Sequence, residues 1–245
     1  MAALNNGFDR ELPAAEGWRA FGSTQAPLRV WLRPEAGETA VGAVVALSQP
    51  SVARALAGHG EPLSLPLPKG ACAARAVADY PSLHRLLRRA LQLSRSLPDE
   101  LLHAFEDKTR SLPRSTEAER LVVQRVGQDL FREGLLDYWE GRCAVTGLAA
   151  AELLRASHIK PWADCPTDAE RLDVYNGMLL APHLDAAFDR GLVTVADEGA
   201  IVVSPVLQAA DRKALGLDVP LAVRRLEAPH RAYLIWHRQR VFRAN

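Results

Sequence analysis

The stretch 142–194 constrains the fold more than any other part of the chain. It holds three ordered segments: an apolar strand with a histidine at 154–161, a strand opening with Asn-Gly at 176–180, and a short helix at 184–191. The helix carries Asp185 and Asp189, which are four residues apart and therefore share a face. Two strands and a helix that gather a histidine, an asparagine and two carboxylates predict a compact metal-dependent site.

Four ordered motifs in this stretch resemble those of the HNH (ββα-metal) endonucleases: Arg-Cys-x-Val-Thr-Gly, Ser-His-Ile, Asn-Gly-x-Leu-Leu and x-Asp-Ala-x-Phe-Asp-x-Gly-Leu. The resemblance covers roughly residues 116–205. It implies that His158 is the catalytic general base and that Asn176 is the second motif residue. It also implies divalent-metal ligands at Asp185, nine residues after the asparagine, and at Asp189.

Phosphodiester chemistry explains why these residue types are needed. The negative charge of the diester repels nucleophiles, so catalysis needs a base of near-neutral pKa, which histidine supplies. It also needs a cation at the scissile phosphate to stabilise the added charge and the leaving oxygen. Carboxylates with water favour Mg²⁺ or Mn²⁺ over zinc, so we expect one of these as cofactor. We assign contact with the phosphate to Lys160 or Arg155.

The sequence departs from the family pattern at two positions. Ser157 stands where relatives commonly carry an Asp or His that helps to hold the metal. Cys143 is followed by Thr146 rather than by a second cysteine, so a structural zinc is not predicted. His183 lies two residues from the expected spacing, and whether Ser157 or His183 joins the metal site stays open.

Each site residue also has an ordinary structural explanation. His158 suits an apolar core strand, and the Asn-Gly pair at 176–177 suits a tight turn. Asp185 in a first helical turn would interact favourably with the helix dipole, and Asp189 could form an ion pair with a nearby arginine. The occurrence of all four motifs in order favours the site.

Length and composition predict two modest domains of ordinary soluble character. The chain has 245 residues, of which 48% are apolar and 24% charged. It has no apolar run of membrane-spanning length and no signal-peptide pattern over residues 1–19, so we expect a cytoplasmic protein without a membrane partner. The net charge of +1 requires any DNA contact to rest on local basic patches.

The N-terminal part, 1–112, predicts a small α+β domain without an enzyme motif. We expect strands at 17–22, 28–32, 40–47 and 71–78, helices at 49–56, 82–94 and 99–110, and a proline-rich loop at 61–70. Four arginines form either a solvated face or a phosphate-binding strip: Arg85, Arg88, Arg89 and Arg95. Five aromatic residues form either the core or a pocket for a flipped base: Phe8, Trp18, Phe21, Trp31 and Tyr80.

The C-terminal part, 113–245, predicts the nuclease domain. Thr116 and Glu119 form a capping box at the head of a connecting helix that runs to Gly141. A hairpin follows the motif stretch at 192–203. The tail at 229–245 is expected to be a helix whose arginines are either solvated or clamp a DNA backbone.

Together these patterns predict an α+β protein with a small N-terminal domain for recognition or sensing, a helical connector and a C-terminal HNH domain. The predicted function is metal-dependent hydrolysis of DNA, and the resemblance implies a restriction or phage-defence setting. Two alternatives stay open: a non-catalytic DNA-binding or sensor protein on a decayed HNH scaffold, and a nuclease gated through residues 1–112. The sequence leaves open DNA versus RNA, the target, and whether the chain is a homodimer.

Overall fold

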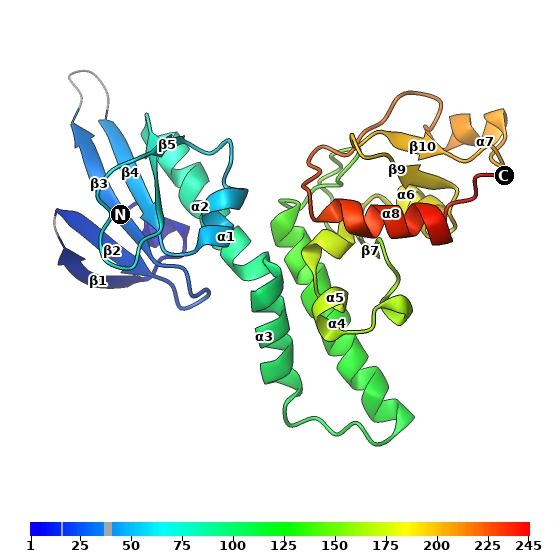
Figure 1. The fold of residues 1–245 in the computed structure, drawn as a ribbon, viewed down its shortest axis with the longest axis horizontal. Helices are drawn as coiled ribbons and strands as arrows, with labels where there is room; N and C mark the ends of the chain where they lie inside the picture. The colour runs from blue at the N-terminus through cyan, green and yellow to red at the C-terminus, as the bar shows by residue number, and fades with distance from the viewer. Residues whose placement is uncertain (16, 37–40) are drawn as a thin grey trace. The chain divides into compact units, whose positions relative to one another are not determined.

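The computed structural model describes residues 1–15, 17–36 and 41–245, which form two compact units (Figure 1). Unit 1 is Met1–Leu97 and unit 2 is Pro98–Asn245. Both units contain helices and strands, in agreement with the expected α+β class. The division falls before residues 98–112, which the sequence analysis grouped with the first domain, because the helix in this segment packs along the next helix of unit 2.

Unit 1 is built on an antiparallel six-stranded sheet with the order β1-β2-β3-β4-β6-β5. Its elements are η1 (Leu4–Asn6), β1 (Arg10–Ala15), β2 (Trp18–Gly22), β3 (Val30–Ala36), β4 (Val41–Leu47), α1 (Pro50–Ala55), β5 (Glu61–Leu63), β6 (Ala73–Val77) and α2 (Tyr80–Ser96). Helices α1 and α2 pack against β4 and β6. Position 40 of the expected strand 40–47 lies outside the described residues.

The two edge strands of this sheet were not expected from the sequence. β1 contains Pro13, and β5 contains Pro62 within the segment 61–70 that was expected to be a loop. A proline cannot donate a ladder hydrogen bond, so it is tolerated at a sheet edge where that donor would face away from the neighbour. The prolines that read as loop signals therefore mark edges instead.

The side chains of unit 1 decide between the alternatives left open for its aromatic and basic residues. Phe8, Trp18, Phe21 and Trp31 are all buried, so they form core rather than an open base pocket. Arg89 is also buried, at 3% exposure, so the four arginines of α2 do not form one exposed strip.

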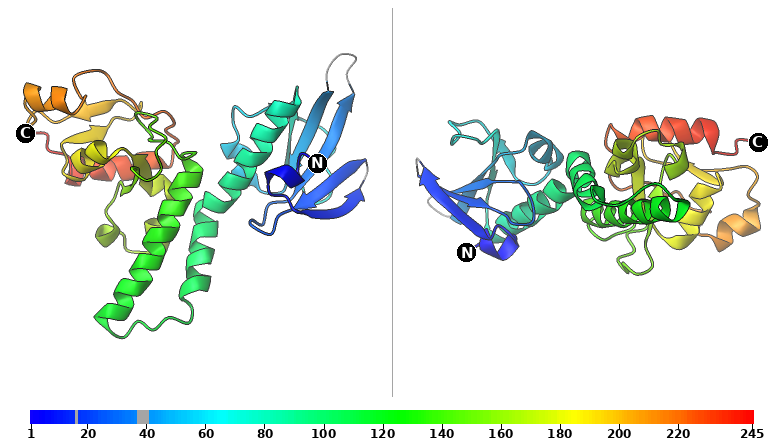
Figure 2. Two further views of the ribbon diagram at one scale, coloured as in Figure 1. Left: turned by 180° about the vertical axis from the view of Figure 1, so that it is seen from behind. Right: turned by 90° about the horizontal axis from the view of Figure 1, so that it is seen from below.

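Unit 2 begins with an antiparallel pair of helices, α3 (Pro98–Thr109) and α4 (Glu117–Tyr138), which lie side by side (Figure 2). The capping box is present: Thr116 accepts from the backbone of Glu119, whose carboxylate accepts from the backbone of Thr116. Leu121 and Val122, near the start of α4, are 58% and 53% exposed.

Two glycines of α4 mark where other segments approach it closely. A Cβ at position 127 would lie 2.5 Å from the indole of Trp162, and one at position 134 would lie 2.5 Å from Leu101. Helix-interior glycine costs about 1 kcal/mol relative to alanine. Glycine is needed at both positions despite this entropic cost, because α3 and the Trp162 loop pack so closely on α4 that a side chain would not fit.

The rest of unit 2 carries the motif segments in two small antiparallel sheets, β7-β8 and β9-β10. Its elements are β7 (Arg155–His158), η2 (Trp162–Asp164), α5 (Asp168–Arg171), η3 (Val174–Asn176), β8 (Gly177–Leu180), α6 (Pro182–Asp189), β9 (Val193–Val195), β10 (Ile201–Val203), α7 (Ala209–Ala214) and α8 (His230–Arg240). The expected 192–203 hairpin is confirmed as β9-β10. In the described part of the chain, no helix is both long enough and apolar enough to span a membrane.

Gly177 is not in a tight turn, contrary to the ordinary explanation of the Asn-Gly pair. Its φ is −151°, which is extended backbone that any residue adopts. A Cβ there would instead lie 2.5 Å from the ring of Phe131 and within about 3 Å of Leu135 on α4. Glycine is therefore needed because β8 lies directly against α4.

The core of unit 2 contains a histidine whose burial predicts a pH dependence of stability. His230 is 0% exposed among aromatic rings, and its Nε2 has no hydrogen-bond partner among the described residues. Burial lowers the pKa of His230 from 6.5 to about 4. The folded-state pKa of His230 lies below the unfolded value. Between the two values the unfolded state binds a proton that the folded state does not, so the free energy of unfolding is highest above about pH 6.5 and decreases as the pH falls toward 4.

We expect His230→Phe to flatten this dependence, because one pKa unit corresponds to ~1.4 kcal/mol of differential proton binding. Free energies of unfolding from urea titrations at pH 7.5 and pH 5 would be compared in parent and variant. The parent should lose more stability than the variant between the two pH values. Equal losses would show that His230 does not titrate in this window.

Candidate active site

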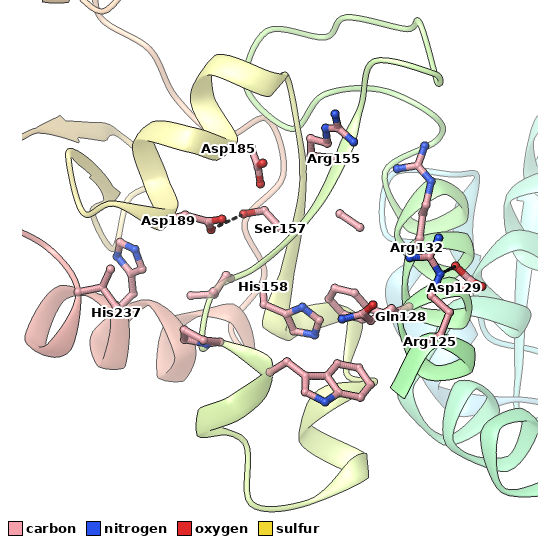
Figure 3. A pocket seen from close by; sticks show the side chains of 16 residues that line it. Arg125, Gln128, Asp129, Arg132, Arg155, Ser157, His158, Asp185, Asp189 and His237 are labelled. Carbon is pink, nitrogen blue, oxygen red and sulfur yellow. Dashed lines mark hydrogen bonds and ion pairs between the residues drawn. The ribbon is translucent and has the colours of Figure 1, made fainter. Parts of the chain in front are cut away.

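The strand β7 and the helix α6 bring His158, Asp185 and Asp189 to one pocket. β7 pairs with β8 in the register His158–Gly177, and α6 packs against β7. The resulting cavity has a volume of about 610 Å³ (Figure 3). It is lined by Arg125, Gln128, Asp129, Phe131, Arg132, Arg155, Ala156, Ser157, His158, Ile159, Pro161, Trp162, Asp185, Asp189, His237 and Val241.

His158 is held in one orientation and one tautomer. Its ring stacks on Phe131 with centroids 3.7 Å apart and meets the edge of Trp162 at 5.7 Å. Its Nε2 lies 2.8 Å from the carbonyl oxygen of Arg171, which can only accept, so Nε2 carries the proton. Nδ1 is then an unprotonated acceptor. Burial lowers the pKa of His158 from 6.5 to about 4, so the ring is neutral at pH 7.

Asp185 and Asp189 form an acidic pair beside Ser157 at the other side of the pocket (Figure 3). The Ser157 hydroxyl donates to Asp189 at 3.4 Å between Oγ and Oδ1. Burial raises the pKa of both carboxyl groups, and the charge of Asp185 raises that of Asp189 further, while hydrogen bonding from Ser157 opposes the shift. Neither carboxylate forms an ion pair within the described residues, although the charge of Arg155 lowers the pKa of Asp185 and that of Arg190 lowers the pKa of Asp189.

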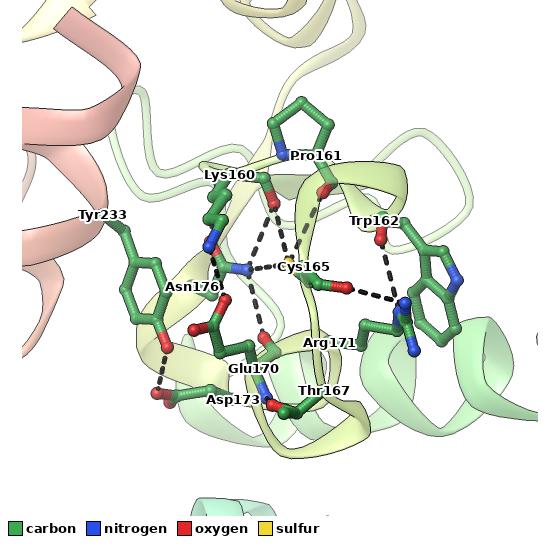
Figure 4. A network of polar contacts seen from close by, with 10 residues as sticks. All are labelled: Lys160, Pro161, Trp162, Cys165, Thr167, Glu170, Arg171, Asp173, Asn176 and Tyr233. Atoms are coloured by element: carbon green, nitrogen blue, oxygen red, sulfur yellow. Dashed lines mark hydrogen bonds and ion pairs between the residues drawn. The ribbon is translucent and has the colours of Figure 1, made fainter. Parts of the chain in front are cut away.

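Asn176 does not line the pocket but clamps the loop that supports His158 (Figure 4). Its side chain is 0% exposed. Oδ1 accepts from the backbone N–H of Lys160 at 2.8 Å, and Nδ2 donates to the carbonyl oxygens of Lys160 and Glu170, each at 3.1 Å. The next carbonyl along, that of Arg171, accepts from His158. Asn176 therefore holds the loop that contacts His158 and does not face the pocket.

We expect Asn176→Ala to destabilise unit 2 by about 2–4 kcal/mol, because it leaves buried backbone groups unpaired. Thermal or urea unfolding measures this, with exposed Gln239→Ala on α8 as the control. A variant with unchanged stability and lost activity would instead place Asn176 among the groups that contact substrate.

The remaining predicted site residues divide between the pocket and other environments. Arg155 is exposed and lines the pocket. Lys160 does not line it, because its ammonium is paired with Glu170 at 2.6 Å (Figure 4). His183 is exposed and also absent from the pocket wall, whereas Ser157 lies between the two carboxylates and the base.

The pocket contains residues that the sequence analysis did not assign to it. α4 contributes Arg125, Gln128, Asp129 and Arg132, and the tail helix α8 contributes His237. His237 is 1% exposed, its Nε2 lies 3.1 Å from the carbonyl oxygen of Phe188 and its ring stacks on the Phe188 ring. It thereby ties α8 to the end of α6, next to Asp189. The spacing of the four α4 residues places them on one helix face, but it does not show which segment packs opposite that face.

Arg238 of the tail helix bonds within the protein, whereas Arg240 and Arg243 are exposed. Arg238 donates to the carbonyl oxygen of Val195 and pairs with Asp197, each at 2.6 Å.

Cys143 is a free thiol whose Sγ accepts from the backbone N–H groups of Thr146 and Ala181 at 3.4 and 3.3 Å. Backbone donors thus satisfy this sulfur within the fold.

Among the described residues, no group of three or more His, Cys, Asp or Glu side chains comes together in a way that could hold a metal ion. Asp185 and Asp189 provide two carboxylates, and Ser157 beside them provides a hydroxyl. Mg²⁺ in proteins keeps several waters and is often bound through one or two carboxylates together with substrate phosphates. The donor set therefore fits a hard divalent ion that shares its coordination with water and substrate.

One segment of the chain is similar to a known family. Residues 143–196 match the family model described as HNH endonuclease. The match supports the HNH family for this part of the chain and suggests a nuclease that acts on DNA. No curated protein matches the chain.

Proposed function

We propose that this protein is a metal-dependent HNH endonuclease that hydrolyses DNA phosphodiester bonds, with His158 as general base and Asp185 and Asp189 as metal ligands. The observation that carries the proposal is the state of His158. Its proton is fixed on Nε2 by the Arg171 carbonyl, and its free Nδ1 belongs to a pocket that also contains the acidic pair. A neutral, oriented imidazole beside two carboxylates that form no ion pair within the described residues suits water activation at a metal-bound phosphate.

In the proposed reaction, Nδ1 of His158 takes the proton of the water that attacks phosphorus in line with the departing 3′ oxygen. The Arg171 carbonyl keeps its hydrogen bond to Nε2–H throughout, and the Phe131 ring keeps the imidazole plane in place. Arg155, exposed at the head of β7, contacts the scissile phosphate. A divalent ion on Asp185 and Asp189 would supply charge neutralisation at the phosphate and the leaving oxygen.

Cleavage of supercoiled plasmid tests the proposal against a decayed, DNA-binding scaffold. The full chain would be incubated with plain and with base-modified plasmid in Mg²⁺, in Mn²⁺ and in EDTA. We expect nicked or linear product with either metal and none with EDTA. DNA binding without cleavage in both metals would favour the decayed scaffold, whose supporting features are Ser157 and the small number of ionisable ligands.

We further propose that unit 1 selects the target, in a restriction or defence setting. Base contacts supply selectivity, whereas phosphate contacts supply position. A fragment of residues 98–245 should therefore show less preference among plain and modified substrates than the full chain. Identical preference in the two would place recognition in the HNH unit.

A further inference from the structure

The walls of the active-site pocket differ in charge. One side carries Asp185 and Asp189 on α6, and the opposite side is a face of α4 with Arg125, Gln128 and Arg132 (Figure 3). These three α4 positions follow a spacing of three and then four residues, which places them on one helix face. We call this face the α4 strip. At 1.5 Å per residue it spans about 10 Å, comparable to the rise of roughly three nucleotides of one DNA strand.

The members of the α4 strip differ in how free they are to bind a ligand. Arg132 donates to the carbonyl oxygens of Leu154 and Ala151 at 2.7 and 2.9 Å, so it anchors α4 to the segment before β7. The side chain of Arg125 is 77% exposed and has one weak partner, Asp129, at 3.7 Å. Gln128 is exposed and makes no side-chain hydrogen bond within the described residues. Arg125 and Gln128 are therefore available donors.

Asp129 competes with a DNA phosphate for Arg125 of the α4 strip. Its side chain is 64% exposed, and it lines the same pocket as Arg125. Exposed ion pairs of this kind are worth only about 0–1 kcal/mol, so Arg125 can exchange Asp129 for a phosphate at small cost. A phosphate held there would also be repelled by the Asp129 carboxylate. Because the net charge of the whole chain is +1, such local charges decide how strongly DNA binds.

We propose that Arg125 and Gln128 bind the DNA backbone phosphates that flank the scissile one, and that Asp129 limits the strength of this contact. The inference rests on the proposed nuclease function, since it extends the same pocket from the reacting phosphate to its neighbours. Binding through phosphates carries no base information, so it positions the strand for cutting without selecting a sequence.

The experiment measures affinity without cleavage. Binding of a fluorescein-labelled duplex DNA of about 20 base pairs, a length that spans roughly two helical turns, would be followed by anisotropy in EDTA over a series of salt concentrations. The proteins are the full chain and its Arg125→Ala, Gln128→Ala, Asp129→Asn and Arg120→Ala variants. Arg120 is the matched control, since it is an exposed arginine of α4 outside the pocket and its loss changes net charge by the same amount.

We expect Arg125→Ala to weaken binding about 3–10-fold and to lower the slope of log affinity against log salt by about 0.9, the loss of one phosphate contact. Gln128→Ala should weaken binding less, without changing the slope. Asp129→Asn should strengthen binding, and Arg120→Ala should leave affinity within about twofold of the parent. Equal effects of Arg125→Ala and Arg120→Ala, or no gain in Asp129→Asn, would overturn the proposal, as would a parent chain that does not bind the duplex.

Single-turnover cleavage at saturating protein separates this inference from the proposed function. Arg120→Ala, whose side chain lies outside the pocket, should then cut at the rate of the parent. If the parent does not cut but the affinity contrasts hold, the nuclease function fails while the α4 strip stands as a backbone-binding surface. If the parent cuts DNA but the affinity differences among the variants are absent, only the inference about the α4 strip is wrong.

Discussion

His158→Ala should lower the rate of DNA cleavage by ~10²–10⁴-fold, the usual cost of losing a general base, while DNA affinity stays close to that of the parent. Nδ1 of His158 is the acceptor left free by the Nε2 contact with Arg171, and within the described residues the ring forms no hydrogen bond with the arginines of the α4 strip. Single-turnover cleavage of plasmid and anisotropy binding of the duplex measure the two quantities separately.

Added imidazole gives this test a second readout. The alanine variant leaves a ring-sized space between Phe131 and Trp162, which both contact the histidine ring in the parent. Free imidazole that enters this space should restore part of the rate, whereas it should not rescue a variant that has simply lost its fold. A variant that cuts as fast as the parent would make His158 structural and the proposed mechanism wrong.

Asp185→Asn and Asp189→Asn should each weaken Mn²⁺ binding and raise the metal concentration needed for half-maximal cleavage. Each variant removes one of two anionic ligands, and a divalent ion binds hard oxygen donors largely through their charge. In the absence of metal the same variants should unfold at the same temperature as the parent or slightly higher. The reason is that burial raises the pKa of both groups, and Asp185 raises that of Asp189, which means that the folded state disfavours their charge.

Calorimetric titration with Mn²⁺ and thermal unfolding without metal test the two halves of this expectation. Asp218→Asn, an exposed carboxylate outside the pocket, controls for the change in net charge. The combination of weaker metal binding and unchanged or raised stability would distinguish ligands from structural carboxylates. Parent-like Mn²⁺ affinity in both variants would remove the acidic pair as the metal site.

Short-range sequence patterns predicted several local elements of unit 2, although not α5 or α7. The capping box at Thr116, the β9-β10 hairpin and the two carboxylates on one face of α6 all depend on residues within a few positions of each other. Such features are encoded by capping side chains, turn residues and helical spacing, so they can be recognised without knowing what packs against them. The ordered motifs likewise indicated an HNH segment, which the family match at 143–196 supports.

The environment of each side chain was decided only by the tertiary structure. Lys160 was expected at a phosphate but pairs with Glu170, and Asn176 is enclosed by backbone groups instead of facing the pocket. The reason is that both depend on how the loop 160–171 folds back on itself, which no periodicity specifies. The Asn-Gly pair was explained as a turn, yet Gly177 is extended and is required because Phe131 lies against it.

The second wall of the pocket depends on the tertiary structure for the same reason. Helical spacing in α4 showed which side chains share a face, but not that this face meets β7 across a cavity. His237, more than forty residues beyond α6, reaches the pocket because it bonds to the Phe188 carbonyl and stacks on the Phe188 ring. The sequence by itself therefore determined the local elements and the HNH motif order, while long-range packing decided which charges surround the base, because packing joins segments whose spacing along the chain carries no periodic signal.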